Sequence, residues 1–355
     1  MAKVIVGMSG GVDSAVTAYL LKEAGHDVIG VTLKIWMNEE NKPSKCCEID
    51  DARAVAAHLD IPYYAVSCVS EFNTCVINPF VEAYLKGLTP NPCIECNRFL
   101  KWERMLDAAK VYGADYVATG HYANIIKLDN GRYTVKKALY AAKDQTYMLY
   151  KLSQEQLAST LMPLGTLSKE SVRMIAEKAG LPVASKPDSQ DICFVTDDTY
   201  ADFITEHAKG TVPPEGNFVD EEGNVLGRHK GIIHYTIGQR KGLGIAFGTP
   251  IYVKEIRPET NEVVLSAEDA IFNDTVYIKD ANFLSIEGLK EGEKLNCNAK
   301  IRYRHNAEPA YIEGMKDGLV KIVFEKPVRA ATPGQSAVFY DSDDCVMGGG
   351  VIVKM

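Results

Sequence analysis

The sequence lacks the features of an exported or membrane-spanning protein. Its first residues, MAKVIVGMSGG, contain no basic stretch, no long apolar stretch and no small-residue cleavage site, so we predict no signal peptide. No run of about 18 apolar residues occurs in the chain, so we predict no membrane span. Nine cysteines, an odd number without an export signal, indicate reduced thiols and a cytoplasmic location.

The chain has little excess charge of either sign. Lys and Arg number 39 and Asp and Glu number 47, which gives a net charge of -8. This balance disfavours non-specific binding to nucleic acid, although a local basic face can outweigh it. With 355 residues, of which 46% are hydrophobic and 24% charged, the chain is long enough for two or three domains with well-buried cores.

Three stretches of different character divide the sequence. Residues 1–203 alternate short apolar strands with amphipathic helices, which predicts a doubly wound parallel sheet covered on both faces. In this stretch QEQLASTLMPLG and SKESVRMIAEKAGLP are both predicted to be helices, the second with Ser168 as its N-cap. Residues 204–265 are rich in Gly and Pro and predict a small central domain. Residues 266–355 alternate apolar and polar residues between Gly, Pro and Asp turns, which predicts an all-β barrel.

The octapeptide GMSGGVDS, residues 7–14, follows the first predicted strand and leads into a helix. Glycines at such a place let backbone N–H groups approach phosphate oxygens, and the helix N-terminus adds a positive partial charge. Ser9 and Ser14 add hydroxyl donors, and Asp13 could reach a phosphate-bound metal ion or cap the helix. The Gly-Lys-Ser/Thr ending of the Walker loop is missing, which suits an enzyme that holds and releases pyrophosphate. A Gly-rich turn without a ligand is the alternative.

Two cysteines three residues apart, Cys93 and Cys96, lie in TPNPCIECNRFLKW. Such a pair is typical of a zinc half-site, a dithiol redox couple or a cluster ligand set. The sequence has no second Cys-x-x-Cys and no His-x₃-His to complete a zinc site. A third cysteine, Cys193, lies in KPDSQDICFV, where the polar neighbours indicate a site loop. Cys46 and Cys47 form a vicinal pair, and the remaining cysteines are interpreted as packing residues: Cys68, Cys75, Cys297 and Cys345.

Together these motifs resemble those of the bacterial tRNA-specific 2-thiouridylases. GMSGGVDS by itself resembles the PP-loop of the N-type ATP pyrophosphatases, which have an adenine nucleotide α-hydrolase-like fold. ADYVATGHYA, KDQTYMLY, DSQDICFV, GQRKGLGI and RYRH then follow in the family's order. The resemblance implies that ATP and Mg²⁺ are used to adenylate the C2 oxygen of wobble uridine 34 in the tRNA anticodon loop. Sulfur from an enzyme persulfide would replace that oxygen, and a cysteine desulfurase or a sulfur-relay protein would supply it.

The resemblance also implies roles for individual residues. Cys193 would carry the persulfide, and Cys96 would be the second catalytic thiol and form a disulfide with Cys193. The residues expected to bind ATP are Gly7, Met8, Ser9, Gly10, Gly11, Val12, Asp13, Ser14, Leu33 and Gly120. The residues expected to bind tRNA are Asn91, Pro92, Cys93, His121, Lys143, Asp144, Gln145, Arg302, Tyr303 and Gln335.

Cys93 departs from the family pattern, because many members carry a catalytic Asp at this position. The role of that carboxylate therefore cannot be carried over to this chain. One interpretation is that Cys93, Cys96 and Cys193 hold a [4Fe–4S] cluster with one open iron. The other is that the enzyme is metal-free and tolerates the substitution.

Two other classes of function remain open at this point. One is a different PP-loop synthetase that adenylates a small metabolite, which would need no cysteine pair. The other is an RNA-binding module that holds a metal through its cysteines, in which the loop at residues 7–14 would have no purpose.

Overall fold

The N-terminal domain is built on a parallel sheet of five strands, in the order β3-β2-β1-β4-β7. Central β1 (Lys3–Gly7) lies between β2 (Asp27–Lys34) and β4 (Tyr116–Ala118), while β3 (Tyr63–Ser67) and β7 (Thr160–Leu161) form the edges. The computed structural model describes residues 1–36, 48–188, 192–195, 199–245 and 248–355. The vicinal pair Cys46 and Cys47 lies outside the described residues.

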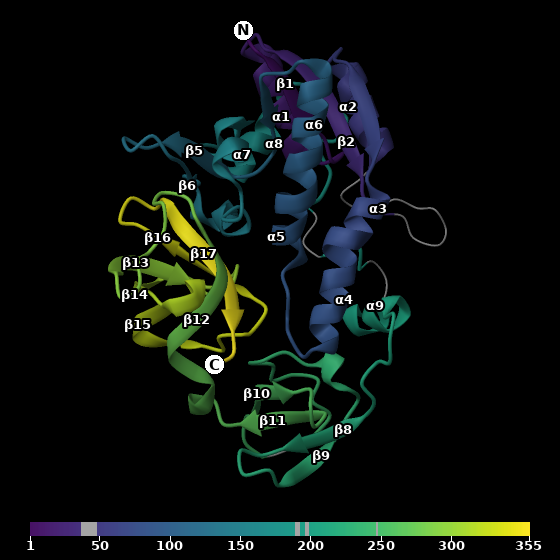
Figure 1. The fold of residues 1–355 in the computed structure, drawn as a ribbon. Coiled ribbons are helices and arrows are strands. Elements are labelled where there is room, and N and C mark those ends of the chain that lie inside the picture. Colours follow the sequence, from purple (N-terminus) through teal and green to yellow (C-terminus); the bar gives the residue numbers. More distant parts are fainter. Residues whose placement is uncertain (37–47, 189–191, 196–198, 246–247) are drawn as a thin grey trace.

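Helices cover both faces of this sheet (Figure 1). Val4 and Val6 of β1 pack in one apolar cluster with α1 (Val12–Glu23), α2 (Ile49–His58) and α8 (Lys169–Lys178). Ile5 points to the other side, into a second cluster with α6 (Trp102–Tyr112). An apolar strand whose alternate residues enter two cores is the pattern of a doubly wound sheet, and the predicted fold class is confirmed.

The predicted helix QEQLASTLMPLG is wrong in its second half. Only α7 (Gln154–Ala158) is helical, and the chain then enters β7, which pairs with β4. Thr160 is fixed there, because its hydroxyl accepts a 2.8 Å hydrogen bond from Trp102 Nε1. Pairing with β4 therefore overrides the helical pattern. Ser168 caps α8 as predicted, with its hydroxyl accepting from the Ser171 N–H at 3.0 Å.

The cysteine pair lies on a helix. α5 (Pro92–Cys96) continues through a π-helical segment, η2 (Asn97–Lys101), into α6, so residues 92–112 form one helical rod. A second rod runs beside it and consists of α3 (Val69–Phe72), the π-helical η1 (Asn73–Ile77) and α4 (Asn78–Leu85). In Figure 1 both rods reach from the N-terminal sheet toward the central domain.

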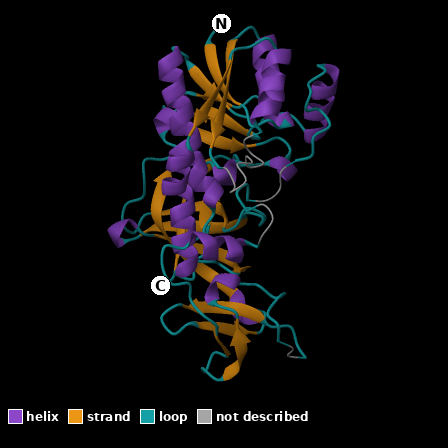
Figure 2. Cartoon of the chain, turned by 90° about the vertical axis from the view of Figure 1, so that its right-hand side faces the viewer, coloured by secondary structure: helices purple, strands orange, loops and turns teal. Residues whose placement is uncertain are grey.

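The central domain begins after α9 (Tyr200–His207) and contains a small sheet in the order β10-β11-β8-β9. Its strands are β8 (Gly216–Val219), β9 (Val225–His229), β10 (Tyr252–Arg257) and β11 (Glu262–Ser266). Phe218, Tyr235 and Val253 belong to its own apolar core. Figure 2 shows this sheet at the opposite end of the molecule from the N-terminus. In the described residues no helix has both the length and the apolar character to cross a membrane.

The C-terminal domain is a closed barrel in the order β12-β15-β14-β13-β16-β17, as predicted. Its strands are β12 (Phe272–Phe283), β13 (Lys294–Lys300), β14 (Glu308–Gly314), β15 (Val320–Arg329), β16 (Ser336–Tyr340) and β17 (Val346–Val353). A hairpin of the N-terminal domain, β5 (Ala123–Lys127) and β6 (Tyr133–Lys137), reaches the barrel, where the Lys137 N–H donates to Asp344 O at 3.0 Å. The short 3₁₀ turns are η3 (Ala141–Lys143), η4 (Thr146–Met148), η5 (Ile232–His234), η6 (Asp269–Ile271) and η7 (Lys316–Gly318).

The barrel and the N-terminal domain share a buried interface. Tyr147 and Tyr150 lie in the same apolar cluster as Val338 and Tyr340 of the barrel. The Tyr147 hydroxyl donates to Ser336 O at 2.8 Å, and the Tyr150 hydroxyl lies 3.0 Å from Ser336 Oγ. Buried polar groups that are paired across an interface fix its geometry, because any slip leaves them without partners.

Asn282 of β12 belongs to this interface and offers a test of it. Its Nδ2 donates to Tyr150 O at 2.6 Å and to Leu152 O at 3.1 Å. Asn282→Ala leaves two carbonyls without their donor, so we expect the free energy of unfolding to fall by about 1–3 kcal/mol. Urea denaturation measures this value, and Asn296→Ala on an exposed position of β13 is the control, expected within about 0.5 kcal/mol of the parent. Equal stability of both variants would contradict the assignment.

Candidate nucleotide and RNA site

A cleft of about 500 Å³ opens at the carboxyl ends of β1, β2 and β4. In open α/β sheets, ligands bind at the carboxyl ends of the parallel strands. Its walls come from the loop after β1, from residues 119–122 after β4, from residues 186–188, and from Tyr303 and Arg304 of the barrel. Two domains therefore line one cavity.

The loop at residues 7–14 forms the floor of the cleft. Gly11 is the N-cap residue of α1, and the helix start has no side-chain cap hydrogen bond. Asp13, in the first turn, therefore does not cap the helix. Ser14 Oγ donates to Gly11 O at 3.0 Å and accepts from the Ser9 N–H at 3.2 Å. Gly10 has φ +79°, and a Cβ atom there would lie 2.5 Å from Glu48 O, so this position requires glycine.

Most residues predicted to bind ATP line the cleft. These are Gly7, Met8, Ser9, Gly11, Val12, Asp13, Ser14, Leu33 and Gly120, whereas Gly10 does not line the cleft and packs against Glu48. A Cβ atom on Gly120 would come within 2.8 Å of the Asp13 carbonyl carbon and the Ser14 nitrogen. The end of β4 therefore touches the loop directly, and a larger residue at position 120 would displace it.

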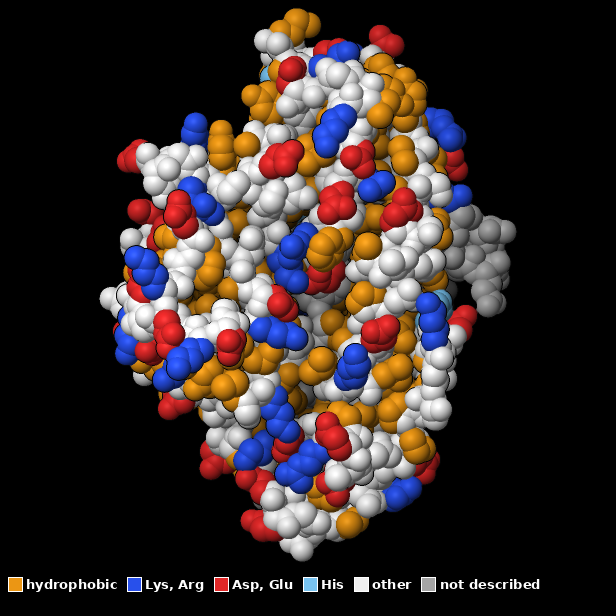
Figure 3. Space-filling view, viewed as in Figure 1, with side chains coloured by type: hydrophobic (Ala, Val, Ile, Leu, Met, Phe, Trp, Pro, Cys, Tyr) orange, Lys and Arg blue, Asp and Glu red, His pale blue; other side chains and the backbone are white. Residues whose placement is uncertain are grey.

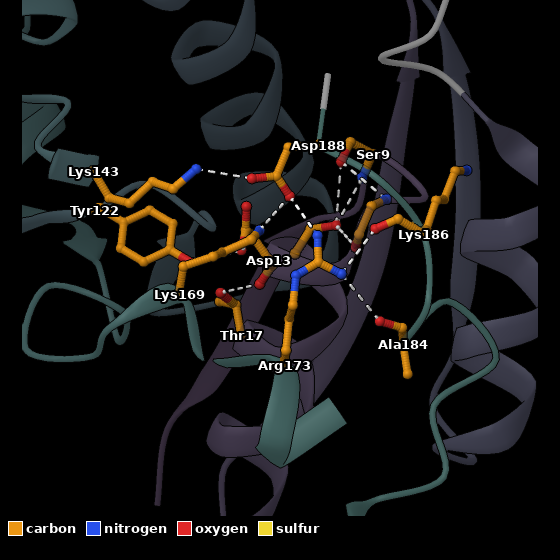
Figure 4. A network of polar contacts seen from close by, with 12 residues as sticks. Ser9, Asp13, Thr17, Tyr122, Lys143, Lys169, Arg173, Ala184, Lys186 and Asp188 are labelled. Carbon is orange, nitrogen blue, oxygen red and sulfur yellow. Dashed lines mark hydrogen bonds and ion pairs between the residues drawn. The ribbon is translucent and has the colours of Figure 1, made fainter. Parts of the chain in front are cut away.

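Asp13 joins the loop to two other elements (Figure 4). Its Oδ1 accepts a hydrogen bond from the Tyr122 hydroxyl at 2.7 Å and an ion-paired hydrogen bond from Lys169 Nζ at 2.7 Å. Burial raises the pKa of Tyr122, and the hydrogen bond to Asp13 raises it further, so this phenol remains a donor. Tyr122 follows β4 and Lys169 begins α8, so one carboxylate fixes three segments.

Asp188 is surrounded by three cations in the same network. Its Oδ1 lies 2.8 Å from Lys169 Nζ and 3.0 Å from Arg173 Nη2, and its Oδ2 lies 2.8 Å from Lys143 Nζ. Burial raises the pKa of Asp188, but hydrogen bonds from Lys143 and Lys169 outweigh that effect and hold the pKa at about 2. Asp188 is therefore ionised at neutral pH.

Lys186, which also lines the cleft, forms a second ion-pair cluster beside the loop. Its ammonium contacts the carboxylates of Glu48 and Asp51 and donates to Gly10 O at 3.1 Å. Burial lowers the pKa of Lys186, and the hydrogen bonds to Asp51 and Glu48 raise it by more, so it stays charged. Two carboxylates balance this lysine, which holds the backbone of the loop.

His121 lies against the cleft as a neutral imidazole. Its Nδ1 is 2.8 Å from Thr119 Oγ1, and its ring centroid is 5.5 Å from that of buried Trp102. Burial lowers the pKa of His121 to about 3, and the charge of Lys101 adds to the shift. His121 can therefore exchange hydrogen bonds with a ligand but adds no positive charge.

The three cysteines of interest have different surroundings. Cys96 is buried in an apolar cluster with Phe72 and Phe194, and Cys193 is partly buried against the same cluster. Solvent reaches Cys93, but protein surrounds it on most sides, and this desolvation raises the pKa of its thiol, while Lys101 acts in the opposite direction. Among the described residues none of the three forms a disulfide, and the predicted catalytic pair, Cys96 and Cys193, shares one apolar environment.

An iron–sulfur cluster does not fit this arrangement of thiols. In the part of the chain that the structure describes, no three His, Cys, Asp or Glu side chains are grouped so that they could hold a metal ion. Cys93 is exposed at the surface of α5, whereas Cys96 is buried in the apolar cluster. No step of the chemistry below therefore passes through a cluster.

Four of the residues predicted to bind tRNA line the cleft: His121, Lys143, Gln145 and Tyr303. Four others use their side chains inside the protein, and these are Asn91, Asp144, Arg302 and Gln335. Asn91 caps α5, and Gln335 Nε2 donates to Thr89 O at 2.8 Å. Pro92 is buried at the start of α5 and Cys93 follows it. The RNA contacts of all ten residues stay predictions.

Two of these internal roles affect how variants will behave. The Asp144 Oδ1 accepts from the Ala138 N–H at 3.0 Å, and Asp144 is buried. Arg302 Nη2 donates to Ile237 O at 2.8 Å and Ala330 O at 2.9 Å, so it connects the central domain to the barrel. Loss of either side chain disturbs the fold as well as any contact with RNA.

The site residues that the sequence predictions do not name include Lys101, Tyr122, Lys169 and Arg304. Three of them lie inside the recognised motifs TPNPCIECNRFLKW, ADYVATGHYA and RYRH, so neighbouring motif residues were the available signal. Lys169 follows the N-cap Ser168 in an ordinary helix start. Only the fold brings it to the loop, 156 residues away in the chain.

The fold and the cleft together define a PP-loop nucleotide-binding domain of the α/β type that carries a β-barrel. Three family models match the chain: a tRNA methyl transferase HUP domain (residues 2–197), a tRNA methyl transferase PRC-barrel domain (201–267) and an aminomethyltransferase β-barrel domain (273–352). Curated relatives called tRNA-specific 2-thiouridylase MnmA come from Lachnoclostridium phytofermentans, 55% identical over 361 residues, and Acetivibrio thermocellus, 53% identical over 358 residues. These alignments cover 100% and 99% of both chains. The chain belongs to the tRNA-specific 2-thiouridylase MnmA family.

A solved structure, the U34-tRNA thiolase NcsA from Methanococcus maripaludis with its [4Fe–4S] cluster, is a distant neighbour. It is 19% identical with a TM-score of 0.36, covering 58% of this chain and 63% of that chain. Likeness at this level bears on neither the site nor its cofactors.

The neutral state of His121 predicts a specific dependence of stability on pH. Its folded pKa of about 3 lies below the unfolded value of about 6.5, so the unfolded chain takes up a proton first as the pH falls. The contribution of neutral His121 to the free energy of unfolding is fully present above about pH 6.5 and is lost toward pH 3. Between pH 6.5 and 5.5 the parent should lose about 1 kcal/mol more unfolding free energy than His121→Gln. Urea denaturation at the two pH values tests this, and equal losses would show that the pKa of His121 is not lowered in the folded protein.

Proposed function

We propose that the chain is an ATP-dependent tRNA sulfurtransferase that converts wobble uridine 34 to 2-thiouridine. The observation that carries the proposal is the single cleft in which the phosphate-binding loop meets Tyr303 and Arg304 of the barrel. A ring and a guanidinium group suit a splayed-out base and its phosphate. Two of the matching family models are described as methyl transferase domains. Methyl transfer, however, requires neither a phosphate loop nor a pair of thiols, and the curated relatives are called thiouridylases.

The surface supports RNA as the substrate despite the net charge of -8. Figure 3 shows Lys and Arg side chains down the middle of one face, where the barrel meets the helical rod of α5 and the central sheet. Lys101, Lys143 and Arg304 line the cleft itself. Basic side chains at the cleft give a chain of net negative charge a local contact for a phosphate backbone.

The first chemical step activates the base. The C2 oxygen of uridine attacks the α-phosphorus of ATP, the bond to the β-phosphate breaks, and pyrophosphate leaves. Backbone N–H groups of the loop at residues 7–14 and the start of α1 face the phosphates in this scheme. Mg²⁺ bound to ATP would neutralise phosphate charge, and Asp13, in the first turn of α1, is the carboxylate placed to help hold it.

The second step replaces oxygen by sulfur. A cysteine desulfurase or relay protein loads Cys193 with a persulfide, whose terminal sulfur attacks C2 and expels AMP. The Cys96 thiolate then attacks Sγ of Cys193, and the bond between Cys193 and the transferred sulfur breaks with its electron pair on the transferred sulfur. The products are 2-thiouridine and a Cys96–Cys193 disulfide, which an external thiol reductant reopens. Cys93, whose thiol has a raised pKa, stays protonated and takes no part as a base.

The cysteine assignment can be tested with unmodified tRNA, ATP and a persulfide donor, with 2-thiouridine measured by mass spectrometry of nucleosides. Cys193→Ser and Cys96→Ser should form none, because a serine hydroxyl can neither carry nor resolve a transferable sulfur. Both variants should still bind ATP and tRNA. Cys75→Ala, at a partly buried cysteine at the edge of the same apolar cluster, is the control and should be active.

Several outcomes of this assay would count against the proposal. Thiolation by Cys193→Ser would remove the carrier role. Pyrophosphate release driven by a small acid in place of tRNA would favour a small-metabolite synthetase. RNA binding without any ATP turnover would favour a binding module.

Arg304 provides the sharpest test of RNA contact, because it is exposed and lines the cleft whereas Arg302 is tied to the protein. Arg304→Ala should weaken tRNA binding and reduce the slope of log affinity against log salt by about one, the effect of one lost phosphate contact. ATP affinity should not change. Lys316→Ala, at the opposite end of β14, is the control. Unchanged tRNA affinity and slope for Arg304→Ala would place this residue outside the RNA interface.

A further inference from the structure

The loop at residues 7–14 contains no lysine that could bind the phosphates of a nucleotide. Another lysine, Lys169, lines the same cleft. We propose that Lys169 binds the β- and γ-phosphates of ATP, and that Asp188 holds this lysine in the nucleotide-free protein and gives it up when ATP binds. The proposal rests on the ATP-using part of the proposed function and is independent of the sulfur chemistry.

Lys169 is positioned by two packed helices. It is the first residue of α8, directly after the N-cap Ser168, and α8 shares an apolar cluster with α1. Its Nζ lies 2.7 Å from Oδ1 of Asp13, which is itself part of the nucleotide loop. The Lys169 side chain is only 11% exposed, so its rotamer is fixed before a ligand arrives, and binding loses little side-chain entropy.

Two other cations near the loop and Asp188 are committed to other partners. Lys186 faces Glu48 and Asp51 and supports the backbone of Gly10, so its charge is already balanced by two carboxylates. Arg173 divides its guanidinium between Asp188 and the carbonyl oxygens of Ala184 and Lys186, at 3.4 and 3.1 Å. Among the ion pairs of the described residues, Lys169 is the cation that contacts both the loop and Asp188.

Asp188 is the anion on which the cations of this network converge, as Figure 4 shows. Lys143, Lys169 and Arg173 converge on its one carboxylate within 3.0 Å. With Asp13 included, three cations face two carboxylates, which leaves one positive charge in excess. A triphosphate carries more charge and more acceptor oxygens than a carboxylate, so it competes effectively for Lys169.

The proposal makes two substitutions act with opposite sign. Lys169→Met removes the cation and should weaken ATP binding by about tenfold to a hundredfold, the effect of one charge-assisted hydrogen bond. Asp188→Asn removes the competing anion and should tighten ATP binding by about threefold or more. If the network only held the fold together, both changes would weaken binding.

Calorimetric titration of the full chain with ATP and Mg²⁺, and separately with AMP, tests the proposal. AMP lacks the β- and γ-phosphates, so Lys169→Met should leave AMP affinity within about twofold, which also shows that the variant is folded. Lys178→Met, on the exposed last turn of the same helix, is the matched control and should bind ATP like the parent.

Equal weakening of ATP and AMP by Lys169→Met, or weaker ATP binding by Asp188→Asn, would overturn the assignment. The result is separate from the test of sulfur transfer. A chain that shows the predicted affinities but forms no 2-thiouridine would refute the proposed sulfur chemistry alone. A chain that thiolates tRNA without these affinity changes would refute the role of Lys169 alone.

Discussion

The ion pair between Asp13 and Lys169 joins the starts of two helices, α1 and α8, whose paired residues are 156 positions apart in the chain. Partly buried charges destabilise a fold unless each has a partner. Among the described residues, four carboxylates near the loop have at least one: Asp13 has Lys169 and Tyr122, Asp188 has three cations, and Glu48 shares Lys186 with Asp51. The loop is therefore held from both sides by charges that also face the cleft.

The position of the barrel depends on a different kind of contact. Tyr147 and Tyr150 are buried in the interface between the domains, and their hydroxyl groups reach Ser336 of the barrel. A Cβ atom on Gly349 would lie 2.8 Å from the ring of Tyr150, so glycine lets strand and ring approach closely. This interface places Tyr303 over an edge of the N-terminal sheet. The site is thus assembled by domain packing, and a change at the interface reaches the cleft without touching it.

The sequence was informative where local pattern and fold agree. Alternation of strand and helix predicted the doubly wound sheet, and alternation within strands predicted the barrel, because both follow from which face of an element is buried. β7 was missed because two residues carry no pattern of their own, and pairing with β4 alone makes them a strand. Lys169 was missed for a similar reason. The residues around it are typical of a helix start, and its partner Asp13 is distant in sequence, so no local pattern indicates a role in the site.

Motifs were less decisive about what each side chain does. Asn91, Asp144 and Gln335 lie in segments that resemble the family, yet their side chains cap a helix, accept a backbone N–H and join a loop to the barrel. A motif records that a position is constrained, and both a structural bond and an RNA contact constrain it. Distances between atoms distinguish a structural hydrogen bond from an RNA contact, and a sequence does not contain distances.

Trp102 lies beside His121, which lines the cleft. This position makes the fluorescence of Trp102 sensitive to the cleft. The chain has only two tryptophans. The other tryptophan, Trp36, packs next to Phe203 and His207 in the apolar cluster that contains Cys96. Indole emission depends on the polarity around the ring, so each fluorophore senses one neighbourhood. The molecule therefore carries two built-in reporters, one beside the nucleotide cleft and one beside the thiols.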